Sequence, residues 1–199
     1  MRKGGIISAG MGVLLVLSLA SCGSPEWTGE DVTATTIGIN ADGSVLEVVV
    51  EDFAEDYYDL DELKQIIESD IAEYNSESGE EEPIKLLEAA KEGGRVRTRT
   101  TYKSTEDYGK FTREPLYFGT VRQSGFSGFE IPSVLDNGGG EDYNVSPEDK
   151  EKHVIFSDGH DRVVSPYKIL AVSKGVKLIS ETEADLSETE GRSALLLVK

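Results

Sequence analysis

Two β-rich runs joined by a short turn constrain the fold of this chain more than any other feature. Residues 32–39 alternate Thr with apolar residues, and residues 44–53 alternate aliphatic with polar residues. Between them lies Asn40-Ala41-Asp42-Gly43, a combination of residue types typical of turns. Strand-like runs separated by so few residues predict an antiparallel hairpin. One face of its second strand carries three aliphatic side chains: Leu46, Val48 and Val50.

An amphipathic helix is predicted over residues 58–75. Asp59 and Glu62 have the spacing of a capping box, and Tyr58 precedes the cap as the first residue of a hydrophobic staple would. Apolar residues then recur every three or four positions and form one stripe, which Ile66 widens. The stripe consists of Leu60, Leu63, Ile67, Ile71 and Tyr74. We expect it to pack on the first hairpin.

A second hairpin is predicted around Gly93-Gly94. Residues 84–91 fit either a helix, with Pro83 at its first position, or a strand. The glycine pair that follows favours the strand. Residues 95–102 alternate strictly. Three basic residues of this run share one face of the strand. They are Arg95, Arg97 and Arg99. We expect them to pair with acidic residues on neighbouring strands. The alternative is that they bind an anionic ligand.

The residues after the second hairpin are predicted to form further helices and strands, which makes the chain an α+β protein. A short helix over 104–111, capped by Ser104, is followed by a strand over 116–121 and then by a glycine-rich segment, 124–152, that we expect to be irregular. Short apolar strands are predicted at residues 153–156, 167–172, 176–179 and 194–198. The fold class is therefore antiparallel β-hairpins packed on one main amphipathic helix, with a short second helix and C-terminal strands.

The N-terminus has the layout of an export signal. Arg2 and Lys3 precede a mostly apolar run over 6–19, which is too short to span a bilayer. Leu-Ala-Ser-Cys at 19–22 closes the run and contains the only cysteine of the chain. These residues resemble a bacterial lipobox, which implies cleavage before Cys22 and diacylglyceryl and palmitate-type chains on that residue. The alternative is an ordinary secretory signal with an incidental thiol.

The lipobox resemblance divides the chain into three parts. Residues 1–21 are the signal peptide, residues 22–31 a short polar tether, and residues 32–199 a single α+β domain. Two or more lipid chains anchor a protein stably, so we expect a location on the extracytoplasmic face of the cell membrane. With a single cysteine the domain has no internal disulfide and depends on its core.

The charge of the chain limits its partners. The formal charge of −18 becomes −20 once Arg2 and Lys3 are removed with the signal. Such an acidic chain is not expected to bind nucleic acid, which requires clustered Lys and Arg. We expect one membrane contact, through lipid on Cys22, and a possible protein partner.

The segment from Thr35 to Val121 resembles a group of small lipoproteins from Gram-positive anaerobes. The similarity lies in DGSVLEVVVEDFAEDYYDLDELKQIIESDIAEYN, TYKSTEDYGKF and LYFGTV. That group has no assigned activity, so the resemblance implies a lipoprotein domain and transfers no functional residue.

Three segments contain residue types that occur in functional sites. Residues 158–161, Asp-Gly-His-Asp, could contribute metal ligands but are more typical of a hairpin turn. Residues 136–142 hold three acids around three glycines, without the spacing of an EF-hand, and favour a solvated loop over a calcium site. Residues 124–128, Ser-Gly-Phe-Ser-Gly, lack the spacing of a nucleophile elbow.

These patterns favour binding over catalysis. We expect no catalytic residue, metal or cofactor, and Cys22 as the one modified position. The leading hypothesis is a lipid-anchored, non-enzymatic interaction or envelope-associated module, in which Phe126 and Phe129 are either exposed contacts or loop anchors. The alternatives are a ligand- or cation-binding lipoprotein and, less favoured, a hydrolase without a known motif.

Overall fold

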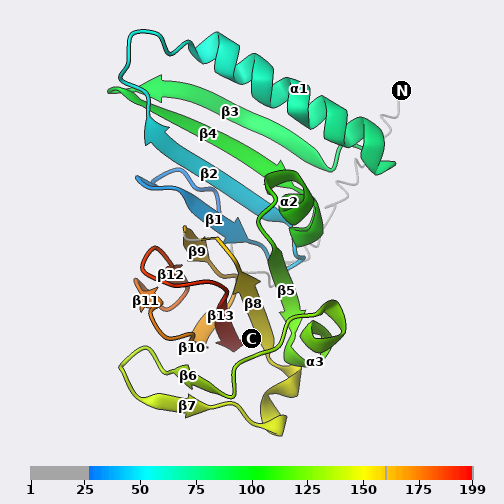
Figure 1. The fold of residues 1–199 in the computed structure, drawn as a ribbon, viewed down its shortest axis with the longest axis vertical. Coiled ribbons are helices and arrows are strands. Elements are labelled where there is room, and N and C mark those ends of the chain that lie inside the picture. Colours follow the sequence, from blue (N-terminus) through cyan, green and yellow to red (C-terminus); the bar gives the residue numbers. More distant parts are fainter. Residues whose placement is uncertain (1–26, 160, 199) are drawn as a thin grey trace, which may run out of the picture.

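The computed structural model describes residues 27–159 and 161–198, which form a mixed α+β fold with two sheets (Figure 1). The first sheet has seven strands, in the order β11 (Lys177–Leu178), β12 (Glu183–Asp185), β9 (Arg162–Val164), β1 (Thr36–Ile39), β2 (Val45–Asp52), β4 (Arg95–Tyr102) and β3 (Ile84–Glu92). The second has six, in the order β5 (Leu116–Thr120), β8 (His153–Ser157), β13 (Ser193–Val198), β10 (Lys168–Val172), β6 (Val134–Asp136) and β7 (Asp142–Asn144). We call them sheet A and sheet B. The helices are α1 (Leu60–Ser78), α2 (Thr105–Thr112) and α3 (Val121–Ser124), with 3-10 turns at η1 (Gly125–Ser127) and η2 (Pro147–Glu151).

Both predicted hairpins are confirmed. Strands β1 and β2 pair in antiparallel fashion across the turn, where Gly43 has a φ of 90°. Strands β3 and β4 are joined through Gly93 and Gly94, both with positive φ, so residues 84–92 form a strand and not a helix. Positive φ suits glycine because it has no Cβ.

Helix α1 begins at the predicted cap, Asp59, but runs to Ser78, three residues beyond the predicted end at residue 75. The carboxylate of Asp59 accepts hydrogen bonds from the backbone amides of residues 61 and 62, and Gly79 ends the helix in the left-handed conformation. Its main contact is with β3, a strand of the second hairpin, instead of the first hairpin. Ile71 is buried, whereas Ile66 is 53% exposed and does not widen the stripe. The side-chain amide of Asn75 also binds both backbone groups of Ile84 and so covers the start of this edge strand.

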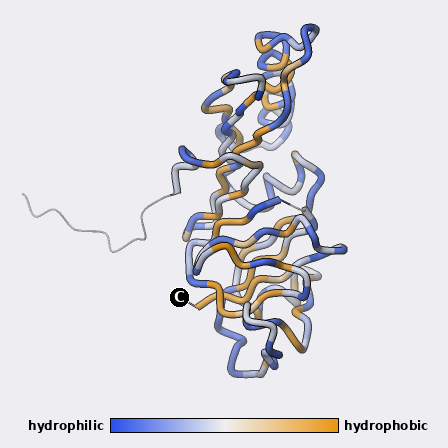
Figure 2. The backbone as a smooth tube through the Cα atoms, turned by 90° about the vertical axis from the view of Figure 1, so that its left-hand side faces the viewer, coloured by the Kyte–Doolittle hydropathy of each residue, from blue (hydrophilic) through white to orange (hydrophobic). Residues whose placement is uncertain are grey.

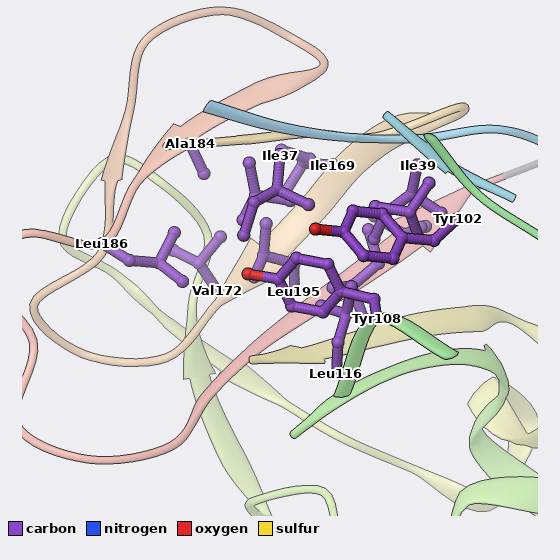
Figure 3. Packing of buried hydrophobic residues seen from close by; sticks show 14 of the residues in the cluster. Ile37, Ile39, Tyr102, Tyr108, Leu116, Ile169, Val172, Ala184, Leu186 and Leu195 are labelled. Carbon is purple, nitrogen blue, oxygen red and sulfur yellow. The ribbon is translucent and has the colours of Figure 1, made fainter. Parts of the chain in front are cut away.

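The main core lies between the two sheets (Figure 3). Sheet A contributes Ile37 and Ile39 from β1, and sheet B contributes Ile155 and Leu195. The same cluster continues to Tyr102 of β4 and to two residues of the helices, Tyr108 of α2 and Ile71 of α1. Figure 2 shows hydrophobic strands gathered in the two-sheet part of the molecule, with hydrophilic segments around them.

The opposite face of sheet B is also buried. Its alternate residues form a second cluster with Leu135 of β6: Val154, Phe156, Ala171, Ala194 and Leu196. Phe129 and Tyr117 pack on this cluster, and their rings stack with centroids 5.1 Å apart. The segment predicted to be irregular, 124–152, therefore holds short elements that cover a sheet face. A sheet with two apolar faces requires such a cover.

The turn at Ser157-Asp158-Gly159 leads from one sheet to the other. Strand β8, before the turn, belongs to sheet B, whereas β9, after it, belongs to sheet A and pairs in parallel with β1. The prediction of a turn is confirmed, but that of a hairpin is wrong, because the flanking strands do not pair with each other. The C-terminal part thus returns to extend the sheet that the first hairpin begins.

Candidate functional site

The first described residues of the chain lie across the outer face of sheet A. We call residues 27–33 the strap. A guanidinium nitrogen of Arg99 donates a hydrogen bond to the carbonyl oxygen of Thr28 at 2.7 Å, and one of Arg95 donates to that of Thr33 at 3.1 Å. Arg97, between them, donates to the carbonyl oxygen of Gly29. Part of the segment predicted as a tether is thus bound to the domain.

The three arginines of β4 form contacts beyond the acidic partners that the sequence predicts. Arg99 pairs with Glu88 of β3 at 3.4 Å, which agrees with the prediction that these arginines meet acidic residues across the sheet. The contacts with backbone carbonyls of the strap were missed, because no side-chain pattern encodes them. The signal that these side chains give in the sequence is three basic residues on one face of a strand in a strongly acidic chain.

Two glycines allow the strap to lie close to the sheet. A Cβ at Gly38 of β1 would lie 1.8 Å from an atom of the Trp27 indole, so the ring sits directly on that backbone. Gly29, in the strap, has a φ of 65°, and a Cβ there would lie 2.6 Å from a methyl group of Val48. The strap therefore covers the aliphatic face of β2, where Val48 is fully buried.

Trp27 borders two open hollows on this face. The larger has a volume of about 670 Å³, and its wall includes Asn40, Asp42 and Pro166. The smaller, of about 380 Å³, includes Leu87, which is 52% exposed. The hollows and the strap form the candidate functional site. The larger one is of a size that suits a small ligand.

A separate polar cluster lies inside the molecule. The hydroxyl of Tyr102 donates a hydrogen bond of 2.6 Å to the carboxylate of Glu47, and the Tyr102 and Tyr108 hydroxyls point the same way (Figure 3). Burial raises the pKa of the Glu47 carboxyl, and the nearby charges of Asp161 and Glu114 raise it further, whereas the Tyr102 hydrogen bond lowers it. The raised pKa means that Glu47 binds a proton more readily in the folded state than in the unfolded chain.

This cluster predicts a pH-dependent effect of Glu47→Gln. The stability contributed by a raised pKa is fully present below the ordinary Glu pKa and is lost as the pH rises through the folded-state pKa. Glutamine stays neutral and still accepts the Tyr102 hydrogen bond. The free energy of unfolding of Glu47→Gln, relative to the unsubstituted chain, should therefore increase from pH 4 to pH 8 in denaturant titrations. Glu73→Gln on the exposed face of α1 is the control, and the same pH trend in both variants would contradict this account.

The sequence of residues 158–161 favours a turn over a set of metal ligands, and those of them that the structure describes belong to no metal site. Asp158 forms a two-bonded ion pair with Arg192, with N–O distances of 2.6 and 2.9 Å. His160 and Cys22 lie outside the described residues. No group of three or more His, Cys, Asp or Glu side chains in the described residues could hold a metal ion.

The glycine-rich acidic loop joins β6 to β7. One carboxylate oxygen of Asp136 accepts hydrogen bonds from the amides of Gly138 and Gly140, and the side-chain oxygen of Asn137 accepts from Gly139 and Glu141. The hydrogen bonds that these side-chain oxygens accept therefore come from the backbone amides of the loop itself. The loop is exposed, as predicted for its solvated interpretation.

Phe126 and Phe129, the two aromatic residues considered for contact with a partner, differ in how far they are buried. Phe129 stacks on Tyr117 and Phe156, and the guanidinium of Arg192 lies 4.5 Å from its ring centre. Phe126, three residues earlier, is 90% exposed. Phe129 is therefore a loop anchor, and Phe126 is the residue available for contact.

No helix within the described ranges 27–159 and 161–198 is long and apolar enough to cross a membrane. Comparisons of the chain with protein-family models, with curated proteins and with solved structures found no significant match.

Proposed function

We propose that this chain is a lipid-anchored protein of the extracytoplasmic membrane face that works as a non-enzymatic interaction or envelope-associated module. The strap is the observation that carries this proposal. A segment next to the proposed lipidated residue is held on the domain by Trp27, Arg97 and Arg99. This arrangement suits a domain that is kept in a defined position beside a membrane. The resemblance to small lipoproteins of Gram-positive anaerobes supports the same conclusion.

The proposed anchor limits which partners the domain reaches. Cys22 and Trp27 are five residues apart, so the chain between them spans at most about 18 Å. Partners must therefore be in the membrane or close to its surface. Phe126, at 90% exposure, is a candidate for direct contact with a protein partner. A single aromatic side chain inserted into a pocket is a common centre of an interface.

In this proposal the domain works as one unit, with the signal at 1–21 removed, residues 32–199 forming the body, and the part of the strap before residue 32 bound to it. Its finer architecture is that of antiparallel hairpins resting on one main helix, α1. The contact between α1 and β3, and the buried position of Ile71 against that hairpin, support this description.

A ligand-binding lipoprotein is the second candidate function. The hollow of about 670 Å³ beside Trp27 favours it, because Asn40, Asp42 and Ser165 place polar groups around an indole ring there. The acidic loop at 136–142 gives less support to a cation, since Asp136 and Asn137 already accept hydrogen bonds from the loop backbone.

Replacing Cys22 by alanine tests the proposed anchor. In the native host, Cys22→Ala should abolish incorporation of labelled fatty acid and stop membrane anchoring through lipid, because stable anchoring depends on the attached chains. Ser21→Ala, which keeps a small residue before the cysteine, is the matched control and should stay lipidated. An unmodified wild-type N-terminus that begins beyond Cys22 would contradict the proposal.

A further inference from the structure

The point where the chain leaves the domain is fixed by the strap. Trp27 sits on Gly38, and the next residue, Thr28, is held by Arg99. The chain before Trp27 therefore starts from a definite place on the outer face of sheet A. Only residues 23–26 separate this place from the proposed lipidated residue. A connection this short leaves the domain little freedom to turn over relative to the membrane.

The surface around this exit is chemically different from the rest of the chain. The charged residues that line the smaller hollow are three basic and two acidic: Lys85, Arg99, Lys103, Glu30 and Glu82. The larger hollow is lined by a single charged residue, Asp42. The two hollows together are thus balanced in charge, whereas the chain without its signal carries −20. A membrane with anionic lipids repels this surface less than it repels the acidic remainder.

The exposed apolar groups on this face also suit a membrane surface. The indole of Trp27 is only partly buried and borders both hollows, and Leu87 beside it is 52% exposed. Tryptophan is enriched at the boundary between lipid and water, where its ring has both an apolar body and a polar N–H group.

We propose that the outer face of sheet A around Trp27 is the membrane-facing surface of this protein, with the indole at the level of the lipid headgroups. This inference rests on the proposed anchor at Cys22. It goes beyond that anchor because it assigns one face of the domain to the bilayer. Phe126 lies in η1, next to the segment whose Phe129 covers the outer face of sheet B, so we expect it to face away from the membrane and to remain open to a partner.

Trp27 is the only tryptophan in the chain, so its fluorescence reports on this face alone. The lipidated protein is reconstituted in phosphatidylcholine vesicles, with or without lipids brominated near the headgroup end of the acyl chains. Bromine quenches indole emission only at short range. We expect the brominated lipids to reduce Trp27 emission. A matched control moves the reporter, by Trp27→Phe together with Phe126→Trp, and its emission should be unchanged.

Flotation of the vesicles measures whether the protein is anchored to them. It therefore tests the anchor independently of the orientation that the quenching reports. Protein that does not float with the vesicles would overturn both. Protein that floats but shows no quenching of Trp27 would overturn the membrane-facing assignment and leave the anchor standing. Equal quenching in the Phe126→Trp control would also overturn the assignment, because it would show a domain without a preferred orientation.

Discussion

Replacing Ile71 by aspartate should reduce the free energy of unfolding by about 3 to 5 kcal/mol, a large part of the total stability of a small domain. Ile71 is the one buried residue of α1 and joins the main core, so aspartate would place a carboxylate there without a partner. Thermal or denaturant unfolding of the chain that lacks the lipid measures the loss directly.

The same substitution at Ile66 is the matched control. Ile66 lies on the same helix but is 53% exposed, so Ile66→Asp should change stability by less than about 1 kcal/mol. Both variants lose one isoleucine and gain one carboxylate, and therefore differ only in the face of the helix. Equal losses from the two substitutions would mean that α1 packs on sheet A by a different face.

The second large effect is expected at Phe129. Phe129→Ala removes a ring that stacks on Tyr117 and Phe156 over the outer face of sheet B, and we expect a loss of about 2 to 3 kcal/mol, somewhat below the usual cost for a fully buried phenylalanine. Phe126→Ala in the same segment should cost almost nothing, because that ring is 90% exposed. A small effect at Phe129 would show that this segment does not cover the sheet.

Local patterns predict the elements of this fold well. Asp59 and Gly79 mark the ends of α1, Ser104 caps α2 through the amide of Asp107, and Gly93-Gly94 identifies the second hairpin. Each of these signals acts between residues that are close in sequence. The strict alternation of residues 95–102 also predicts which side chains of β4 are buried, because successive residues of a strand point to opposite faces.

Long-range pairing is what the sequence leaves open. Strands β9 and β1 pair although more than a hundred residues separate them in the sequence. The strands β6, β7, β9 and β12 have three residues each, which is too few to show an alternating pattern. The face of β2 with Val48 looks like the inner face of the first hairpin, yet it is covered by the strap. Alternation shows that a face is buried but not what buries it.

The candidate site was the least predictable part for the same reason. Its contacts join side chains of Arg95, Arg97 and Arg99 to carbonyl oxygens of the strap. Every residue has a carbonyl, so such bonds leave no mark on the sequence. Gly38 is the exception, since a glycine inside a strand is a signal of close approach by another group.

The most direct measurement of the central claim, that the strap is part of the folded domain, is the emission of Trp27 in the Cys22→Ala chain before and after Gly38→Ala. Alanine fits the strand at residue 38, but its Cβ would lie 1.8 Å from an indole atom and must displace the ring. We predict a blue-shifted emission for the chain with Gly38 and a shift to the red for Gly38→Ala, with the sheet content by circular dichroism unchanged. Identical emission of a fully exposed indole in both chains would contradict the account.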